Sequence, residues 1–271
     1  MDNMDNTSSI TLIIDGDVIA HGACRNRWGS VNSPSVAFTE EEDELYLLEC
    51  LTNVDRIINQ LEETTFANKV LIAVKGENNF RQILFPSYKA HRKYRPVNTF
   101  VDLVREYLVS KGKAVAADGM EADDLLHIWR NEAIANNEVP IIASIDKDLL
   151  CIPGRHYRFP RGNLHEVGSR DPNLIIEVSE FEAEHHYYMQ LLMGDSTDGI
   201  PGLPQVGKVR AAAILSDCKT LEDLQFMTCY AYKGIIGDKW KEALILTGQL
   251  ITILPYRDFK FSIDGWKMPD E

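Results

Sequence analysis

The sequence of 271 residues lacks the features that would place it in a membrane or outside a cell. It contains no unbroken apolar run of about 18 residues, the length that a membrane-spanning helix requires. Its N-terminus lacks the basic and apolar stretches of a secretory signal. Its five cysteines form an odd set without CxxC spacing, so neither a disulfide framework nor a thiolate zinc site is expected. We therefore expect a cytoplasmic protein with reduced thiols.

Glycine and proline, with 17 and 11 residues, are not enriched, and this excludes collagen-like and low-complexity classes. The chain is 45% hydrophobic and 25% charged, as in ordinary globular proteins. Its length allows one large domain or two smaller ones.

The net charge of -13 argues against a protein that binds a polyanion over its whole surface. One stretch reverses this argument locally. Residues 75–111 contain eight basic and three acidic residues, a local charge of +5 on a strongly acidic chain.

The hydrophobic pattern predicts an α/β fold with a central, mostly parallel sheet flanked by helices. Short apolar runs at 10–14, 70–74 and 140–144 indicate buried strands, and helical patterns at 41–62 and 100–109 lie between them. From about residue 179 the pattern becomes mainly helical. We expect an α/β region at 1–178 and a helical region at 179–271.

Four groups of acidic residues stand at strand ends or helix starts. They are Asp15 with Asp17, Glu121 with Asp123 and Asp124, Asp146 with Asp148, and Asp195 with Asp198. A solvated acidic face would explain any one group. Four groups that converge would repel one another unless cations neutralised them. Because carboxylate oxygens select hard cations, we expect two Mg²⁺ or Mn²⁺ ions and phosphoester hydrolysis.

The acids at 121–124 form the most specific of the four groups. Glu121 and Asp124 are three residues apart, so on a helix both carboxylates can reach one site. Simple capping of a helix N-terminus is the alternative, since that end of a helix favours negative charge.

Two further segments indicate nucleic-acid binding. Cations alternate with aromatic residues at 80–81 and 88–95, as in proteins that contact phosphates and stack on bases. We expect contacts from Arg81, Tyr88, Lys89, Arg92, Lys93 and Arg95, although a solvated basic face is the alternative. The turn at 199–208 contains Gly202, Gly207 and Lys208, which suit a close approach of backbone to phosphate. A plain turn between two helices is the alternative there.

Five motifs in order resemble those of the 5'-nuclease family: flap endonucleases, the 5'-nuclease domains of bacterial DNA polymerase I and bacteriophage 5'-3' exonucleases. The similarity is greatest to short phage members, including those of T7-like phages. The motifs are IIDG at 13–16, YKAHR at 88–92, EADD at 121–124, DKD at 146–148 and GDSTDG at 194–199. They extend over roughly residues 10 to 215.

The resemblance implies a PIN-like core, a helical arch at about 80–112, and a C-terminal helix-three-turn-helix that binds duplex DNA. It implies that Asp15, Glu121, Asp123 and Asp124 bind a first metal ion, and that Asp146, Asp148, Asp195 and Asp198 bind a second. Lys89 and Arg92 would contact the scissile phosphate, and Tyr88 would stack on a terminal base. Gly202, Gly207 and Lys208 would lie in the helix-three-turn-helix, where the family often also holds K⁺.

One position departs from the family pattern. The family usually has an acidic residue after the second strand, whereas residues 73–76 read Ala-Val-Lys-Gly. Glu77 could replace that acid only if the loop shifted by one residue.

We therefore expect a monomeric, metal-dependent 5'-3' exonuclease or flap endonuclease in the cytoplasm of a bacterium or phage-infected cell. Its substrates would be DNA with 5' ends, flaps or single-strand/duplex junctions, with RNA primers in RNA/DNA hybrids as a further candidate. A haloacid-dehalogenase-like phosphohydrolase with Asp15 as nucleophile is one alternative, because 15–18 reads DGDV. A catalytically inactive protein that binds DNA junctions is the other.

Overall fold

The computed structural model describes residues 9–24, 39–94, 98–159 and 174–269. The chain divides into two compact units. The first unit contains Met1–Glu77, Pro96–Ile145 and Arg155–Ile176, and the second contains Asn78–Arg95, Asp146–Gly154 and Glu177–Glu271. This division differs from a single cut near residue 178, because two short segments from before that residue, Asn78–Arg95 and Asp146–Gly154, belong with the C-terminal helices.

A six-stranded sheet forms the centre of the first unit, in the order β3-β2-β1-β4-β5-β6. The strands are β1 (Ile10–Asp15), β2 (Lys69–Lys75), β3 (Val115–Ala117), β4 (Val139–Ser144), β5 (Gly154–Arg158) and β6 (Ile175–Val178). The pairs β1 with β2, β1 with β4, β2 with β3 and β4 with β5 are parallel. The predicted α/β fold and its three predicted strands are confirmed.

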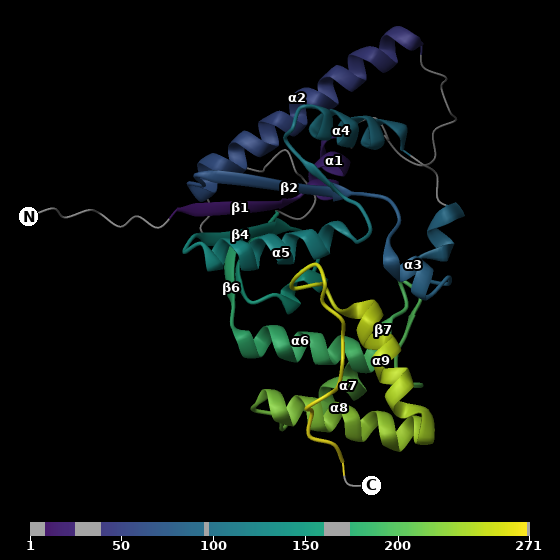
Figure 1. Cartoon of the computed structure of the whole chain (residues 1–271). Coiled ribbons are helices and arrows are strands. Elements are labelled where there is room, and N and C mark those ends of the chain that lie inside the picture. The colour runs from purple at the N-terminus through teal and green to yellow at the C-terminus, as the bar shows by residue number, and fades with distance from the viewer. Residues whose placement is uncertain (1–8, 25–38, 95–97, 160–173, 270–271) are drawn as a thin grey trace, which may run out of the picture. The chain divides into compact units, whose positions relative to one another are not determined.

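Helices cover both faces of this sheet (Figure 1). On one side lie α1 (Gly16–Ala23), α2 (Glu40–Thr65) and α4 (Thr99–Ser110), and on the other lies α5 (Ala122–Ala135). Leu12 and Ile14 belong to the core beneath α1, α2 and α4. Ile13 faces the opposite side, since side chains alternate along a strand. Because both faces are buried, β1 contains the continuous apolar run seen in the sequence.

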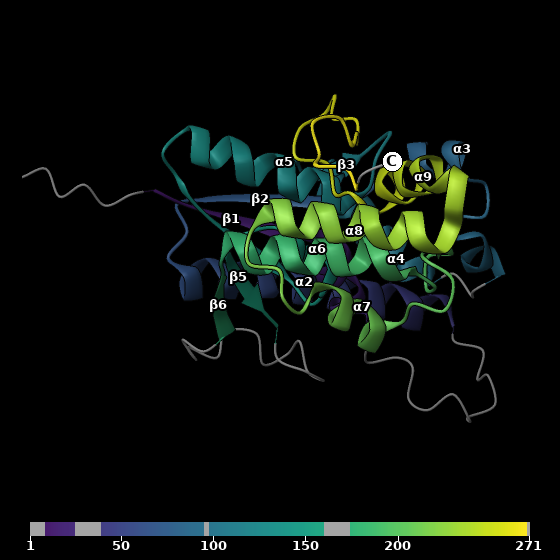
Figure 2. The ribbon, with the colours of Figure 1, turned by 90° about the horizontal axis from the view of Figure 1, so that it is seen from below.

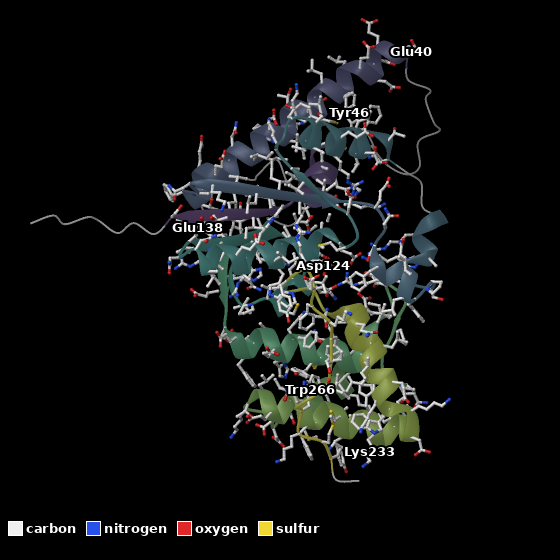
Figure 3. The ribbon with its side chains drawn as sticks, viewed as in Figure 1. Glu40, Tyr46, Asp124, Glu138, Lys233 and Trp266 are labelled. Atoms are coloured by element: carbon white, nitrogen blue, oxygen red, sulfur yellow. The ribbon has the colours of Figure 1, made fainter. Side chains whose placement is uncertain are left out.

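Polar contacts fix the helices of the first unit to one another. Tyr46 of α2, labelled in Figure 3, donates a hydrogen bond to the carbonyl of Cys24 at the end of α1. Asp55 of α2 accepts hydrogen bonds from Tyr107 Oη at 2.7 Å and Lys113 Nζ at 2.6 Å. These contacts hold α4 and the turn that follows it against α2.

The second unit is mainly helical. Its principal helices are α6 (Glu180–Met193), α7 (Lys208–Leu215), α8 (Leu221–Ile236) and α9 (Trp240–Ile251). Helices α6 and α8 run side by side (Figure 2), and they bury Leu192, Leu224 and Tyr232 in a core of their own. Trp266 covers this core and contacts the Tyr188 ring at a centroid distance of 5.6 Å.

A short antiparallel hairpin of β7 (Gly194–Asp195) and β8 (Ile200–Pro201) follows α6. Gly194 has a φ of 66°, which favours glycine. A Cβ atom on Gly202 would lie 2.0 Å from the carbonyl carbon of Met193. Only glycine permits this approach, so the hairpin geometry requires glycine at both positions.

The segment predicted as a helical arch, about 80–112, is not one element. Residues 80–94 form α3 (Phe80–Leu84) and a 3₁₀ helix, η2 (Ala90–Tyr94), both in the second unit. The helix α4 belongs to the first unit and packs against α1 and α2. Val101, Val104 and Leu108 of α4 are buried in the hydrophobic core of the first unit.

Among the described residues, no helix is both long enough and apolar enough to cross a membrane.

Candidate active site

Asp15 ends β1 and begins α1, so its side chain lies at the carboxyl end of the central strand. It is 6% exposed. Its Oδ1 accepts a hydrogen bond from the Val18 amide at 3.2 Å, and its Oδ2 accepts one from Ser144 Oγ at 2.8 Å. Ser144 is the last residue of the neighbouring strand β4. Two adjacent strand ends therefore orient this carboxylate.

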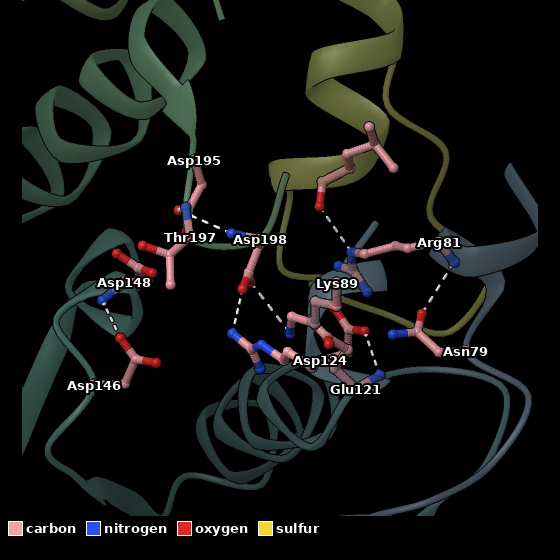
Figure 4. A network of polar contacts seen from close by, with 12 residues as sticks. Asn79, Arg81, Lys89, Glu121, Asp124, Asp146, Asp148, Asp195, Thr197 and Asp198 are labelled. Carbon is pink, nitrogen blue, oxygen red and sulfur yellow. Dashed lines mark hydrogen bonds and ion pairs between the residues drawn. The ribbon is translucent and has the colours of Figure 1, made fainter. Parts of the chain in front are cut away.

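The acids of the EADD motif lie at the start of α5. Glu121 is the N-cap residue, and its amide donates to Asp124 Oδ2 at 2.9 Å (Figure 4). Asp124 is fully buried, and Asp123 is half-buried. The capping alternative is thus realised for Asp124 through one of its oxygens. Metal binding by the three acids stays a prediction.

The strand β2 brings no carboxylate to this region. Ala73 is the residue of β2 paired with Asp15 in the sheet register, and it is fully buried. The main chain of Glu77 is tied to the turn after β3, because its amide donates to Asp118 Oδ1 at 2.9 Å and its carbonyl accepts from Gly119. These contacts fix the main chain of the loop, and residues 73–76, where the sequence departs from the family pattern, contain no acid.

Asp17 has a structural role. Its Oδ1 accepts hydrogen bonds from the Lys75 amide at 3.1 Å and from Arg105 Nε at 2.8 Å. It connects α1 with the end of β2 and with α4. This arrangement distinguishes Asp17 from Asp15, although both belong to the same DGD sequence.

The other four predicted metal ligands belong to the second unit. Asp146 and Asp148 flank the turn that leads into the 3₁₀ helix η3 (Asp148–Cys151), and the Asp148 amide donates to Asp146 Oδ1 at 2.9 Å. Asp148 Oδ1 accepts a hydrogen bond from Gln190 Nε2 of α6 at 2.8 Å. The two acids are therefore held by main-chain and side-chain donors.

Asp148 lies in an environment that disfavours its charged form. Burial, followed by the charges of Asp146, Asp195 and Asp198, raises the pKa of Asp148 to about 6. Lys147 acts in the opposite direction. Negative charge thus accumulates around Asp148 in excess of what the nearby lysine neutralises.

The hairpin after α6 supplies the remaining acids and meets the basic segment. Asp195 Oδ1 accepts from the amide of Thr197 at 2.7 Å. Asp198 forms an ion pair with Lys89 Nζ at 3.3 Å, as Figure 4 shows, and a second one with Arg92. The Lys89 amide also donates to the Asp198 carbonyl at 2.8 Å. The predicted phosphate-binding pair therefore lies directly beside a predicted metal ligand of the same unit.

The prediction that Arg81 contacts DNA is not supported. Arg81, labelled in Figure 4, is 2% exposed. Its guanidinium donates to the carbonyls of Leu250 at 2.8 Å and Thr252 at 2.6 Å. These carbonyls lie at the C-terminal end of α9, where the helix leaves its carbonyls without main-chain partners. Arg81 therefore anchors α3 to α9, and its buried guanidinium is not accessible to DNA.

The prediction that Tyr88 stacks on a terminal base also needs correction. Tyr88 is 3% exposed and packs with Ile200 and Leu250 in a small apolar cluster. Lys89 Nζ lies 4.9 Å from the centre of its ring. A base could reach this ring only after a rearrangement, so in this structure Tyr88 is a packing residue.

The predicted contacts in the turn before α7 differ in accessibility. Gly202 is packed against the end of α6, so its backbone serves the hairpin rather than a ligand. Gly207 is exposed and caps α7, and a Cβ atom added to it would meet no other atom within 4 Å. Lys208 is exposed at the first position of α7. The side chain of Lys93 and all of Arg95 lie outside the described residues.

The acidic residues fit divalent cations in their chemistry, because their donors are all carboxylate oxygens and the charge around Asp148 would be relieved by a cation. Within residues 9–24, 39–94, 98–159 and 174–269, however, no three Asp, Glu, His or Cys side chains converge as they would around an ion. The eight acids are divided equally between the two units. Their convergence into one pocket stays a prediction.

Two site residues escaped prediction from the sequence. Ser144 could have been found, because it directly ends the third predicted strand. Gln190 carried no signal, since its contact with Asp148 joins positions 42 residues apart.

Comparison with known proteins assigns a family to this arrangement. The family model of the 5'-3' exonuclease N-terminal resolvase-like domain matches residues 11–172, more than half of the chain. The chain belongs to this family. The predicted membership of the 5'-nucleases is thereby confirmed, and it favours a nuclease over the haloacid-dehalogenase-like alternative.

Individual proteins similar to this chain are consistent with the family assignment. The chain is 30% identical over 172 residues to DNA polymerase I of Borreliella burgdorferi, covering 61% of this chain but only 18% of that protein. It is 25% identical to a 5'-3' exonuclease of Buchnera aphidicola, covering 62% of this chain and 59% of the relative. Its fold is similar to that of the bacteriophage T5 flap endonuclease in a complex with DNA and metal ions. That likeness has a TM-score of 0.62 and 17% identity, and it covers 91% of this chain and 89% of the other.

Proposed function

We propose that this protein is a divalent-metal-dependent 5'-3' exonuclease and structure-selective flap endonuclease that hydrolyses DNA phosphodiesters at 5' ends or single-strand/duplex junctions. The observation that supports it most is in the second unit, where the buried Asp148 lies among like charges and Lys89 and Arg92 pair with Asp198. Such a unit combines the carboxylates that bind cations with the basic side chains that bind phosphate.

The carboxylates that would hold the ions are Asp15, Glu121, Asp123 and Asp124 in the first unit and Asp146, Asp148, Asp195 and Asp198 in the second. Bound Mg²⁺ or Mn²⁺ would lower the pKa of water and neutralise charge on the phosphate. Ser144 and Gln190 orient two of the acids, Asp15 and Asp148. No side chain is required to form a covalent intermediate.

Lys89 and Arg92 are the catalytic residues of the proposal. Both side chains form ion pairs with Asp198. An incoming DNA phosphate offers the same oxygen chemistry to both side chains, and Arg binds phosphate through two parallel hydrogen bonds. We infer that they exchange Asp198 for the scissile phosphate and stabilise the charge that develops on its oxygens.

Duplex binding is assigned to Gly207 and Lys208, which are exposed at the start of α7. K⁺ in this helix-three-turn-helix, activity on RNA in RNA/DNA hybrids and a monomeric state belong to the same proposal. The DNA polymerase I relatives are several times longer than this chain, so the proposal concerns the activity of the matched part.

The deciding experiment uses 5'- and 3'-labelled blunt, nicked, flap and RNA/DNA substrates with Mg²⁺, Mn²⁺ or EDTA. We expect cleavage with either ion, 5'-phosphorylated products and no cleavage in EDTA. Asp148→Ala should abolish cleavage while leaving junction binding intact, because it removes a predicted ligand and not a DNA contact. Lys89→Ala should slow cleavage much more than it lowers stability.

Other outcomes would support the alternatives. Cleavage that persists in EDTA would refute metal dependence. Junction binding without cleavage in either ion would indicate an inactive DNA-binding protein. Turnover of a small phosphomonoester with a trapped phosphoaspartate at Asp15 would indicate a phosphohydrolase.

A further inference from the structure

The face of α6 that meets the 146–148 turn carries two polar side chains one helical turn apart, His186 and Gln190. The His186 ring donates a hydrogen bond to the main-chain carbonyl of Lys147. Gln190 Nε2 donates to Asp148 Oδ1 at 2.8 Å. Because residues four apart lie on the same face of a helix, α6 contacts this turn at two successive levels.

The contact with Gln190 leaves the two oxygens of Asp148 in different situations. Oδ1 accepts the Gln190 hydrogen bond. Oδ2 accepts no hydrogen bond from any residue that the structure describes. An ionised carboxylate can only accept, so the amide nitrogen of Gln190 must be the group that faces it.

The charge of the donor is important here. A lysine or arginine at position 190 would neutralise Asp148 and compete with a cation for it. A glutamine fixes the carboxylate by one hydrogen bond and leaves its full negative charge in place. Neutral groups that hydrogen-bond to metal-binding side chains commonly determine their orientation and the affinity of the site.

We propose that Gln190 is a positioning residue that holds Asp148 by Oδ1 and presents Oδ2 to a divalent cation. This role rests on the proposed function, because it assigns Asp148 to a metal site. Gln190 itself contacts neither the cation nor the DNA. Its effect should therefore appear in metal affinity and disappear when Asp148 is absent.

The test is isothermal titration of Mn²⁺ into the full, metal-free chain. Gln190→Met keeps the length of the side chain and removes the donor. We expect this variant to bind Mn²⁺ about 10-fold more weakly, with an unfolding temperature in EDTA close to that of the wild type. Elevated Mn²⁺ should restore its cleavage rate, since only occupancy of the site is reduced.

Gln249→Met is the matched control. Gln249 lies on α9 of the same unit, is half-buried and makes no side-chain hydrogen bond within the described parts of the chain. It should bind Mn²⁺ as the wild type does. In an Asp148→Ala background, Gln190→Met should cause no further loss of affinity, and a further loss there would contradict action through Asp148.

Should Gln190→Met fail to fold, Gln190→Asn provides the same test, because it withdraws the amide by one methylene group. Affinity within about twofold of the wild type in a folded variant overturns the role of Gln190 alone. A wild-type chain that binds no Mn²⁺ overturns the metal-dependent function together with it.

Discussion

Replacing Arg81 by methionine should destabilise the second unit strongly. The guanidinium donates to the carbonyls of Leu250 and Thr252 and is 2% exposed. Each hydrogen bond from a charged donor contributes about 1.5–3 kcal/mol, and methionine would leave both carbonyls without this donor. We expect a loss of about 3 to 5 kcal/mol in the free energy of unfolding. That is a large part of the stability of an ordinary domain.

Urea denaturation followed by tryptophan fluorescence and by far-ultraviolet circular dichroism measures this loss. Arg92→Met is the matched control, because the Arg92 side chain is 42% exposed and its ion pair with Asp198 should contribute less than about 1 kcal/mol. If Arg81→Met unfolded at the wild-type urea concentration but bound DNA more weakly, the anchoring role would be refuted and Arg81 would be a DNA contact.

Two further predictions concern the acidic turn and the hairpin. Asp148→Asn should stabilise the protein in EDTA at pH 8 by about 1 to 2 kcal/mol, but not at pH 4. The pKa of Asp148 is about 6 in the folded protein and 3.8 ordinarily, so the charged carboxylate destabilises the folded state at pH 8, whereas at pH 4 the folded protein keeps this group protonated. Equal effects on urea unfolding at the two pH values would contradict this. Gly202→Ala should lower the unfolding temperature substantially, since its Cβ would lie 2.0 Å from Met193. A Cβ atom at Gly207 would have no neighbour within 4 Å, so Gly207→Ala should change the free energy of unfolding by less than about 1 kcal/mol. A large loss of stability in calorimetry would contradict the open surroundings of Gly207.

Sequence patterns predicted the first unit well. Apolar runs of strand length alternate with helical patterns in the sequence. This periodicity depends only on residues close together in the chain, so it can be recognised without the tertiary structure. The strands at 10–14, 70–74 and 140–144 appear as β1, β2 and β4. The helices at 41–62 and 100–109 appear as α2 and α4.

Local patterns were not sufficient to predict the structure of the arch segment, residues 80–112. Its residues were predicted as one segment because they are continuous and basic. In the structure, α4 packs in the first unit because Val101, Val104 and Leu108 are buried in its core. In the second unit, Arg81 joins α3 to α9 through a hydrogen bond to the Leu250 carbonyl. Helical periodicity shows that a face will be buried, but it does not show against which partner.

The sequence by itself determined the fold class, the family and the list of acidic residues, since each depends on spacing along the chain. Only the tertiary structure decided which charged side chains are available to a ligand. Arg81 and Arg92 are both arginines of one basic segment, yet one is buried against the end of a helix about 170 residues away and the other remains partly exposed. Burial depends on what distant segments bring to a site, and residue type alone does not contain that information.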